Sequence, residues 1–352
     1  MEHESSKKKL FSPPPEPSFV LRSFESGVTC VHYSIIDNKS FLYAADQIGL
    51  VYLYNLHLRT NIFKFQAHEN NESIFGLSLF SQNKNNFVTL GKDGFVKVWD
   101  LDKSINKTPI WTYQLNHCSF CNCDITQNLI VVPLKESSTV GTLDYRLSSS
   151  VIVQKFSPSN KCGMVMKLHV LNDKWLFIAY ENGLLAVYNL INSQPIAEIN
   201  VIENKDEPLM AMDVCSFVDN QKTNDDDNDE FIIATCLCGT SLNEIYSIEF
   251  IEQKKLNQFS LRKQDKTKFH LLLPNNGCNV IKYRQDSKLF ALSSWDSRIR
   301  LYRRHNGKQL VMFDYHHQHV NCIDFSPNTF QMACGSNDRT VSIWDIYNRK
   351  ME

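Results

Sequence analysis

One ten-residue pattern recurs along this chain and constrains its fold more than any other feature. Each copy has a polar turn that often contains Gly or Asp, then alternating apolar residues, and it ends in an aromatic residue usually followed by Asp or Asn. Alternation with a period of two predicts a strand with one buried face, and the strand-like run before each turn completes a hairpin. The clearest copies lie at 47–56, 92–101, 181–190, 295–304 and 337–346.

The terminal aromatic residue of each copy marks the register of the repeat. Two weaker copies, TVGTLDYRL and TSLNEIYSI, supply two further marks, and successive marks are then 45, 46, 43, 58, 56 and 42 residues apart. Repeats of about 40 to 45 residues with four strands each are typical of β-propeller blades. The sequence therefore predicts an all-β, seven-bladed propeller. The seven marks are Tyr54, Trp99, Tyr145, Tyr188, Tyr246, Tyr302 and Trp344.

Two charged segments account for the two long spacings. Residues 219–230 include six acidic residues among twelve, which cannot be buried together, so we expect a disordered loop on blade 5. Residues 252–268 are charged and lack periodicity except at FSL, so we expect a second insertion there. Without these insertions both spacings approach the other four.

The last blade lacks sequence for its own outer strand, because only five residues follow IWDIY at 343–347. An unpaired outer edge would template aggregation. The strand-like run SFVLRSF at 18–24 lies near the other terminus. We expect Phe19, Leu21 and Phe24 to belong to an N-terminal strand that closes blade 7. The predicted organisation is a flexible Pro-rich tail at 1–17, a propeller at 18–347 and a C-terminal tail at 348–352.

Two blades carry the residue types of a hydrogen-bonded tetrad. The blade 2 set is His68, Thr89, Asp93 and Trp99. The blade 7 set is His316, Asp338 and Trp344, with Cys334 in the hydroxyl position, so we expect it to be incomplete. A His, Asp and hydroxyl grouping also suggests nucleophilic catalysis. Each member occupies a structural position of the repeat, and buried polar groups need partners in any fold. We therefore interpret both sets as structural.

The segment HCSFCNC at 117–123 raises the possibility of zinc, since it holds one His and three Cys. Structural zinc sites usually combine two separated ligand pairs, which this spacing does not provide. We expect Cys121 and Cys123 to share one face of the inner strand of blade 3 and to pack in the core, where free Cys is common. The chain also lacks a Gly-rich phosphate loop and a His-Glu-x-x-His motif. We predict no catalytic, cofactor-binding or metal site.

Composition narrows the classes of partner. Lys and Arg number 37 against 38 Asp and Glu, which gives a formal net charge of −1, so there is no general basic field for nucleic acid. We find no apolar run long enough to span a membrane and no apolar signal core near the start. We expect a soluble intracellular protein whose 11 cysteines are free thiols. The run SKKKL at 6–10 is either a weak nuclear signal or a solvated end.

An aromatic residue among arginines suggests a protein-binding surface. In SSWDSRIR at 293–300, Trp295 precedes the turn, and Arg298 and Arg300 follow it. The segment DYHHQH at 314–319 should lie on the same face and adds His316, His317 and His319. We predict that these residues form a partner-binding rim on blades 6 and 7. The alternative is that the indole packs over a neighbouring loop and the arginines are solvated.

The strands VKVWDL and VSIWDI, with HVNCIDFSP, identify the chain as resembling WD40-repeat propellers. The two ends resemble a narrower group, the ASTRA-associated protein 1 family, also called guanine nucleotide-binding protein beta-subunit-like protein 1. The points of likeness are the Pro-rich lead into FVLR, the WDSRIR turn and WDIY as the final strand. The family usually has Gly where Ser294 stands in this chain.

That resemblance implies a non-enzymatic adaptor. Its partners would be the Tel2–Tti1–Tti2 co-chaperone, the AAA+ ATPases pontin and reptin, and the large phosphatidylinositol-3-kinase-related kinases that they mature, with a link to chromatin regulation. We expect a monomer within a larger complex, in nucleus and cytoplasm, without direct contact to nucleic acid or membrane. The alternatives are a substrate receptor of a cullin ubiquitin ligase, a G-protein-beta-like signalling scaffold, and an enzyme.

Overall fold

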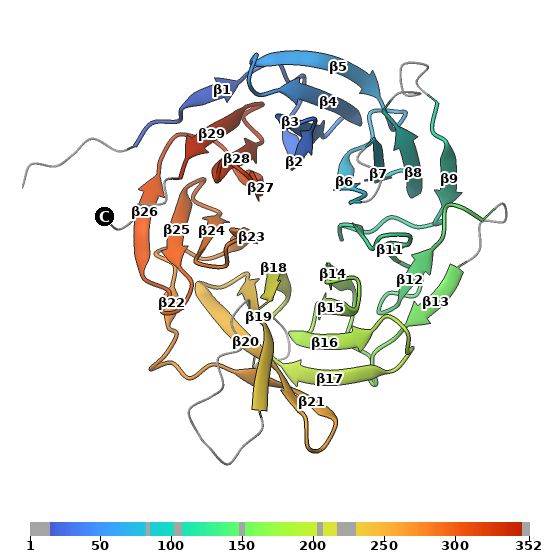
Figure 1. Ribbon diagram of the computed structural model, residues 1–352, viewed down its shortest axis with the longest axis vertical. Coiled ribbons are helices and arrows are strands. Elements are labelled where there is room, and N and C mark those ends of the chain that lie inside the picture. The colour runs from blue at the N-terminus through green and yellow to red at the C-terminus, as the bar shows by residue number, and fades with distance from the viewer. Residues whose placement is uncertain are drawn as a thin grey trace, which may run out of the picture.

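The computed structural model describes residues 15–81, 85–101, 108–147, 152–202, 207–216 and 230–346. Every secondary-structure element in these ranges is a β-strand. The strands are arranged as seven antiparallel sheets around a central axis (Figure 1). No described segment is a helix with the length and apolarity needed to cross a membrane. The seven blades predicted from the repeat are therefore confirmed.

Each blade has four strands that succeed one another outward from the axis. Blade 1 consists of β2 (Val28–Ile36), β3 (Lys39–Asp46), β4 (Leu50–Asn55) and β5 (Thr60–Gln66). Blade 2 consists of β6 (Ile74–Leu79), β7 (Asn86–Gly91), β8 (Phe95–Asp100) and β9 (Trp111–Gln114). Blade 3 consists of β10 (Asp124–Ile125), β11 (Ile130–Pro133), β12 (Val140–Leu143) and β13 (Ile152–Phe156). Blade 4 consists of β14 (Val165–Leu171), β15 (Trp175–Tyr180), β16 (Leu184–Asn189) and β17 (Pro195–Asn200).

The last three blades follow the same plan with two variations. Blade 5 consists of β18 (Leu209–Ser216), β19 (Glu230–Thr240), β20 (Glu244–Gln253) and β21 (Gln258–Lys263), and β22 (Leu271–Leu272) also pairs with β20. Blade 6 consists of β23 (Cys278–Tyr283), β24 (Leu289–Ser294), β25 (Ile299–Arg303) and β26 (Gln309–Phe313). Blade 7 consists of β27 (Val320–Phe325), β28 (Gln331–Ser336), β29 (Val341–Asp345) and, as its outer strand, β1 (Phe19–Leu21).

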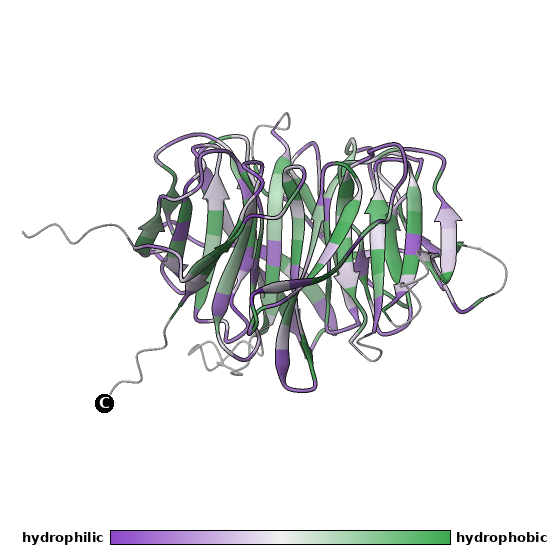
Figure 2. Ribbon diagram, turned by 90° about the horizontal axis from the view of Figure 1, so that it is seen from above, coloured by the Kyte–Doolittle hydropathy of each residue, from purple (hydrophilic) through white to green (hydrophobic). Residues whose placement is uncertain are grey.

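Loops alternate between two faces of the disc because each blade is an antiparallel meander. We call the face at which every inner strand begins the top face, and the face at which it ends the bottom face. The turn between the second and third strands of a blade lies on the top face, as does the segment that leads into the next blade. The side view in Figure 2 shows the loops gathered on these two faces.

The hydrophobic core lies between neighbouring blades. Seven clusters of buried residues each combine side chains from two adjacent blades. The register-marking Trp99 packs edge-on against Phe65 of blade 1, with ring centroids 4.8 Å apart. Trp344 packs against Phe313 of blade 6 in a tilted arrangement, with ring centroids 4.4 Å apart. The repeated aromatic residue is therefore the contact that joins each of these blades to the one before it.

An N-terminal strand closes the ring, as predicted. Phe19 pairs with Ile343 and Leu21 with Val341 in an antiparallel register. The Ser18 amide extends the ladder by donating to the Ile343 carbonyl at 2.8 Å. The outermost strands of blade 7 thus come from opposite ends of the sequence (Figure 1).

Phe24 contributes to closure in a different way from that expected. The strand ends at Leu21, so Phe24 lies beyond it. Its ring is buried against Tyr52 and Tyr54 of blade 1, with centroids 4.8 and 5.5 Å away. The N-terminal segment therefore pairs with blade 7 through its backbone and packs on blade 1 through this side chain.

Blade 5 departs most from the sequence-based interpretation. Residues 252–268 are not an insertion, because they contain the end of β20 and the whole outer strand β21. Because β21 is the outermost strand of its blade, it does not need strict apolar alternation. The sequence pattern therefore did not indicate a strand there. Glu230 is the first residue of β19 and pairs with Gln253, while 219–229 lie outside the described residues.

Two weak register marks also need correction. Tyr145 follows the end of β12 at Leu143, and Tyr246 lies near the start of β20. Both identify the correct third strand but not the equivalent position within it. The segment 6–10 and both predicted tails, apart from residues 15–17, lie outside the described residues.

Candidate functional site

The blade 2 tetrad forms as its residue types suggested. The His68 imidazole is fully buried, with Nδ1 2.8 Å from Asp93 Oδ2 and Nε2 2.8 Å from Thr89 Oγ1. The Trp99 indole donates to the same hydroxyl at 2.9 Å. Burial lowers the pKa of His68, although the Asp93 carboxylate opposes this effect. The tetrad links the top-face turn to the blade interior and exposes no reactive hydroxyl.

The blade 7 tetrad is complete, contrary to expectation, because Ser342 replaces Cys334 as the source of the hydroxyl. His316 Nε2 lies 2.7 Å from Ser342 Oγ, and the Trp344 indole donates to that oxygen at 2.8 Å. Ser342 is directly opposite Cys334 in the β28–β29 ladder. The hydroxyl has therefore moved one strand outward while staying at the same level of the sheet.

Removal of the Ser342 hydroxyl should destabilise blade 7. We expect Ser342→Ala to lower the free energy of unfolding by about 1–3 kcal/mol, because it leaves the buried His316 and Trp344 nitrogens without their partner. Adding Cys334→Ser should recover part of the loss by returning the hydroxyl to the position that Thr89 holds in blade 2. Urea unfolding of the three proteins measures this. Equal stability of Ser342→Ala and the unchanged protein would contradict the assignment.

The Trp295 turn is held rigidly on the top face of blade 6. The indole covers Gly277, where an added Cβ would lie 2.0 Å from the ring, and Gly277 has a φ of +85° that favours glycine. Trp295 nevertheless remains 43% exposed. The indole therefore packs over a neighbouring loop, as the alternative interpretation expects, and still presents a large apolar surface. Partner binding at this residue stays a prediction.

Arg300 is not a surface residue, which corrects its place in the predicted rim. Its side chain is 2% exposed and forms an ion pair with Asp296, and its Nη1 donates to Ser294 Oγ at 2.7 Å. Burial alone would raise the pKa of Asp296, but hydrogen bonds from Arg300, Ser294 and the Arg298 amide outweigh it and lower the pKa. The guanidinium stabilises the turn from inside the blade.

His316 is also buried, in the blade 7 tetrad, and so is not available to a partner. The pKa of its partner Asp338 falls to about 2, because hydrogen bonds from His316 and Thr340 outweigh the effect of burial. His317 and His319 are exposed. Arg298 is 40% exposed, and its Nε lies 3.1 Å from Asp314 at the start of that loop. The exposed part of the predicted rim is therefore Trp295, Arg298, His317 and His319.

The segment 117–123 does not form the expected strand, because β10 begins at Asp124. Cys121 packs in the cluster between blades 3 and 4, and Cys123 in the cluster between blades 2 and 3, so they do not share one face. Burial raises the pKa of Cys121 to about 12, which keeps the thiol protonated. Cys118 is exposed. Over the described ranges, no three His, Cys, Asp or Glu side chains gather as metal ligands would.

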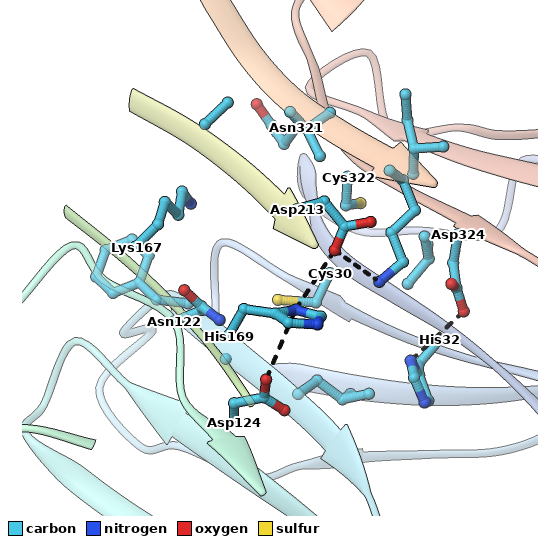
Figure 3. Close-up of a pocket in the computed structure, with 18 of the residues that line it drawn as sticks. Cys30, His32, Asn122, Asp124, Lys167, His169, Asp213, Asn321, Cys322 and Asp324 are labelled. Atoms are coloured by element: carbon cyan, nitrogen blue, oxygen red, sulfur yellow. Dashed lines mark ion pairs between the residues drawn. The ribbon is translucent and has the colours of Figure 1, made fainter. Parts of the chain in front are cut away.

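A ring of polar residues in the central channel escaped the sequence analysis. One residue from each inner strand contributes, and in six strands it is the fifth residue. We call this set the channel ring: His32, Ser78, Asp124, His169, Asp213, Lys282 and Asp324. The signal in the sequence was a polar residue at a fixed place in each inner strand, but only closure of the ring of blades brings the seven residues together around the channel. Figure 3 labels five of them, His32, Asp124, His169, Asp213 and Asp324.

The channel ring joins neighbouring blades. Asp324 Oδ2 accepts a hydrogen bond from the Tyr33 amide at 2.8 Å, and Asp213 and Asp124 accept equivalent bonds from the next inner strands. Asp213 also lies 3.7 Å from Lys282 Nζ, and its attraction raises the pKa of that ammonium. Desolvation lowers the pKa of His32, partly offset by Asp324. This arrangement holds strands together and contains no activated nucleophile.

Comparison with known proteins agrees with this architecture. A family profile described as "WD domain, G-beta repeat" matches residues 59–100 and 307–345. The fold is shared with a chain of the mitotic checkpoint complex, at a TM-score of 0.73, 11% identity and coverage of 99% and 97% of the two chains. It is also shared with the Cps50 (Swd1) propeller domain of Myceliophteria thermophila, at 0.70, 15% identity and coverage of 95% and 100%. The chain thus has the seven-bladed β-propeller fold and contains WD40 repeats at the matched residues. Propellers with such repeats typically mediate protein–protein interaction and are non-enzymatic.

Two curated relatives match almost end to end. The mouse guanine nucleotide-binding protein subunit beta-like protein 1 is 27% identical over 351 residues, which cover 96% of this chain and 98% of that protein. ASTRA-associated protein 1 of Schizosaccharomyces japonicus is 22% identical over 383 residues, which cover 95% and 99%. The resemblance to ASTRA-associated protein 1 and its beta-like relatives is thus confirmed across most of the chain, at low identity.

Proposed function

We propose that this chain is a non-enzymatic adaptor that works with the Tel2–Tti1–Tti2 co-chaperone in the maturation of phosphatidylinositol-3-kinase-related kinases. The end-to-end likeness to ASTRA-associated protein 1 carries the proposal, since it extends beyond the repeats that all WD40 propellers share. Pontin and reptin are proposed as further partners, with the protein acting as a monomer within the larger complex, in nucleus and cytoplasm, and linked to chromatin regulation.

The exposed rim on blades 6 and 7 is the proposed contact surface for this assembly. Trp295 presents a half-exposed indole on a turn that Asp296 and Arg300 hold rigid, and Arg298 lies beside it. A pre-organised aromatic residue next to a guanidinium is typical of residues that dominate binding energy. Loops on a rigid scaffold commonly carry such recognition residues.

Loss of this rim should weaken partner capture. We expect Trp295→Ala with Arg298→Ala to reduce affinity for the co-chaperone at least thirtyfold, which corresponds to about 2 kcal/mol. Quantitative pull-down with purified Tel2–Tti1–Tti2 measures this. The matched control is Lys308→Ala with Leu310→Ala, which removes an exposed cation and an apolar side chain that is also 43% exposed, but at the outer edge of blade 6. Undiminished capture by a folded Trp295 variant would exclude this rim.

A pull-down from cell extract with mass spectrometry separates the alternative functions. A cullin receptor would capture a ligase adaptor, and a G-protein-beta-like scaffold would capture a gamma chain. The Trp-Asp-x-Arg sequence at 295–298 lies in a turn between β24 and β25, and not at the end of a third strand as a cullin receptor requires. That position favours the adaptor.

A further inference from the structure

The top-face mouth of the channel is built by a repeated β-bulge. In six inner strands the pairing with the second strand shifts at the second residue. A bulge adds one unpaired residue and re-aims its side chain. The bulged residues are Thr29, Phe75, Met166, Met210, Asn279 and Asn321. Since they lie where their strands begin, they surround the mouth.

On the polar half of this mouth, the side chains already form hydrogen bonds within the protein. Thr29 Oγ1 donates to the Ala45 carbonyl at 3.2 Å. Asn279 Nδ2 donates to the Val320 carbonyl at 3.3 Å, and Asn321 Nδ2 to the Val28 carbonyl at 2.8 Å. These side chains on blades 6, 7 and 1 therefore support the strands next to them.

The other half of the mouth is apolar and partly uncovered. Phe120 is 69% exposed in the loop before β10, and its ring contacts that of Phe75 with centroids 5.8 Å apart. Met164, before β14, is 46% exposed. We call this set the apolar crescent: the exposed Phe120 and Met164, and the half-buried Phe75, Met166 and Met210 at the bulged positions. Methionine adapts readily to varied apolar partners, and exposed apolar side chains gathered at one place mark interaction surfaces.

Lys167 lies immediately below the crescent. It is the third residue of β14, and the corresponding residues of the other five bulged strands are Cys30, Gly76, Ala211, Val280 and Cys322. It is thus the charged residue of this layer. Among the described residues, no carboxylate lies within ion-pair distance of its ammonium. The three aspartates one layer down pair with His32, His169 and Lys282. Figure 3 shows its side chain apart from those ion pairs.

We propose that the mouth docks a partner-protein segment in which an acidic side chain is flanked by apolar ones. The carboxylate enters the channel and pairs with Lys167, and the flanking side chains cover the apolar crescent. The proposal rests on the protein-binding role proposed above and adds the chemistry of the bound segment. A cation framed by thiols and small apolar groups attracts a carboxylate more strongly than one in open water does.

Charge also excludes other occupants of this mouth. A basic segment would place a second cation beside Lys167. A nucleic acid would need several phosphate contacts, whereas the layer supplies one cation in a chain of net charge −1. The acidic, apolar-flanked segment satisfies both features at once.

Peptide selection tests the proposal with defined probes. A phage library of random twelve-residue peptides is panned on the immobilised full chain and on the Lys167→Glu variant. We expect the unchanged protein to enrich peptides with Asp or Glu between apolar residues, and Lys167→Glu to enrich Lys or Arg at that place. The enriched peptides are then synthesised with a fluorescent label, and their affinities are measured by anisotropy.

Single variants locate the contact. Lys167→Met should weaken the labelled peptide at least tenfold, and Phe120→Ala severalfold. Lys161→Met is the control. It removes an exposed cation from the top-face segment that leads into β14, and it should leave the affinity unchanged. Lys167→Gln is the second variant if Lys167→Met does not fold, as judged by its thermal unfolding.

Three results would overturn the proposal. These are enrichment of peptides without an acidic residue, equal binding by Lys167→Met, and no enrichment above the bare support. Failure of the co-chaperone pull-down alone would refute the proposed function, because the selection uses no co-chaperone. A peptide site that depends on Lys167 would survive that failure.

Discussion

A chain that begins at residue 25 is expected to aggregate or to unfold at a much lower temperature than the full protein. It loses β1, the outer partner of β29, and exposes an edge strand that can template association. It also loses Leu21 and Phe24, which are 5% and 6% exposed. Burial of each such side chain stabilises by about 1.5–3 kcal/mol, before the backbone pairing is counted.

Two further proteins make the truncation informative. Deletion of residues 1–12 should leave the unfolding temperature unchanged, because the closure contacts begin at Ser18. Phe24→Ala alone should cost about 3–5 kcal/mol, the usual loss for a buried aromatic ring. Calorimetry of the soluble proteins measures both. If the chain from residue 25 melts with the full protein, then ring closure by this segment contributes nothing to stability.

Arg300 should produce the second large effect, and the effect should be on stability. We expect Arg300→Met to lower the free energy of unfolding by about 3–5 kcal/mol, because it removes the buried partner of the Asp296 carboxylate, which is 8% exposed, and leaves only the half-exposed Arg298 guanidinium 3.9 Å away. Arg303→Met changes an exposed neighbour and should have little effect. Asp296→Asn added to Arg300→Met should recover much of the loss, since no charge then remains buried. Urea unfolding measures all three.

The pH dependence gives the same assignment an independent check. The pKa of Asp296 is lower in the folded protein than its ordinary value, so its contribution is full at neutral pH and is lost as pH falls below about 4. The stability difference between the unchanged protein and Arg300→Met should therefore narrow in acid. A constant difference from pH 7 to pH 3 would show that the loss comes from packing instead of charge.

Regular periodicity is what made the fold predictable. Alternating strands that end in Trp99 and Trp344 require a neighbour to cover their aromatic faces, and a repeat of about 40 residues supplies that neighbour seven times. The missing outer strand and the run at 18–24 then identified closure. Blade 5 was harder to delimit, because β21 lies outermost and does not need the apolar alternation by which the other strands were recognised.

The candidate site was predictable only where it depended on local sequence. The exposed Trp295 and Arg298 follow from a turn and its flanking residues. Arg300 was misplaced because the sequence does not say on which side of β25 a guanidinium lies, and the structure turns it inward to Asp296. Likewise, Ser342 supplies the blade 7 hydroxyl because strand pairing places it opposite Cys334.

The sequence by itself determined most of the strands, the number of blades and the join between the two ends, since each follows from periodicity and hydrophobic burial within about 40 residues. The tertiary structure alone decided which side chains share the central channel. Asp324 meets Tyr33, almost three hundred residues away, and Lys167 has no carboxylate at its own level among the residues that the structure describes. Such partners are chosen by closure of the ring, which brings inner strands together in an order and at heights that no local pattern of residues specifies.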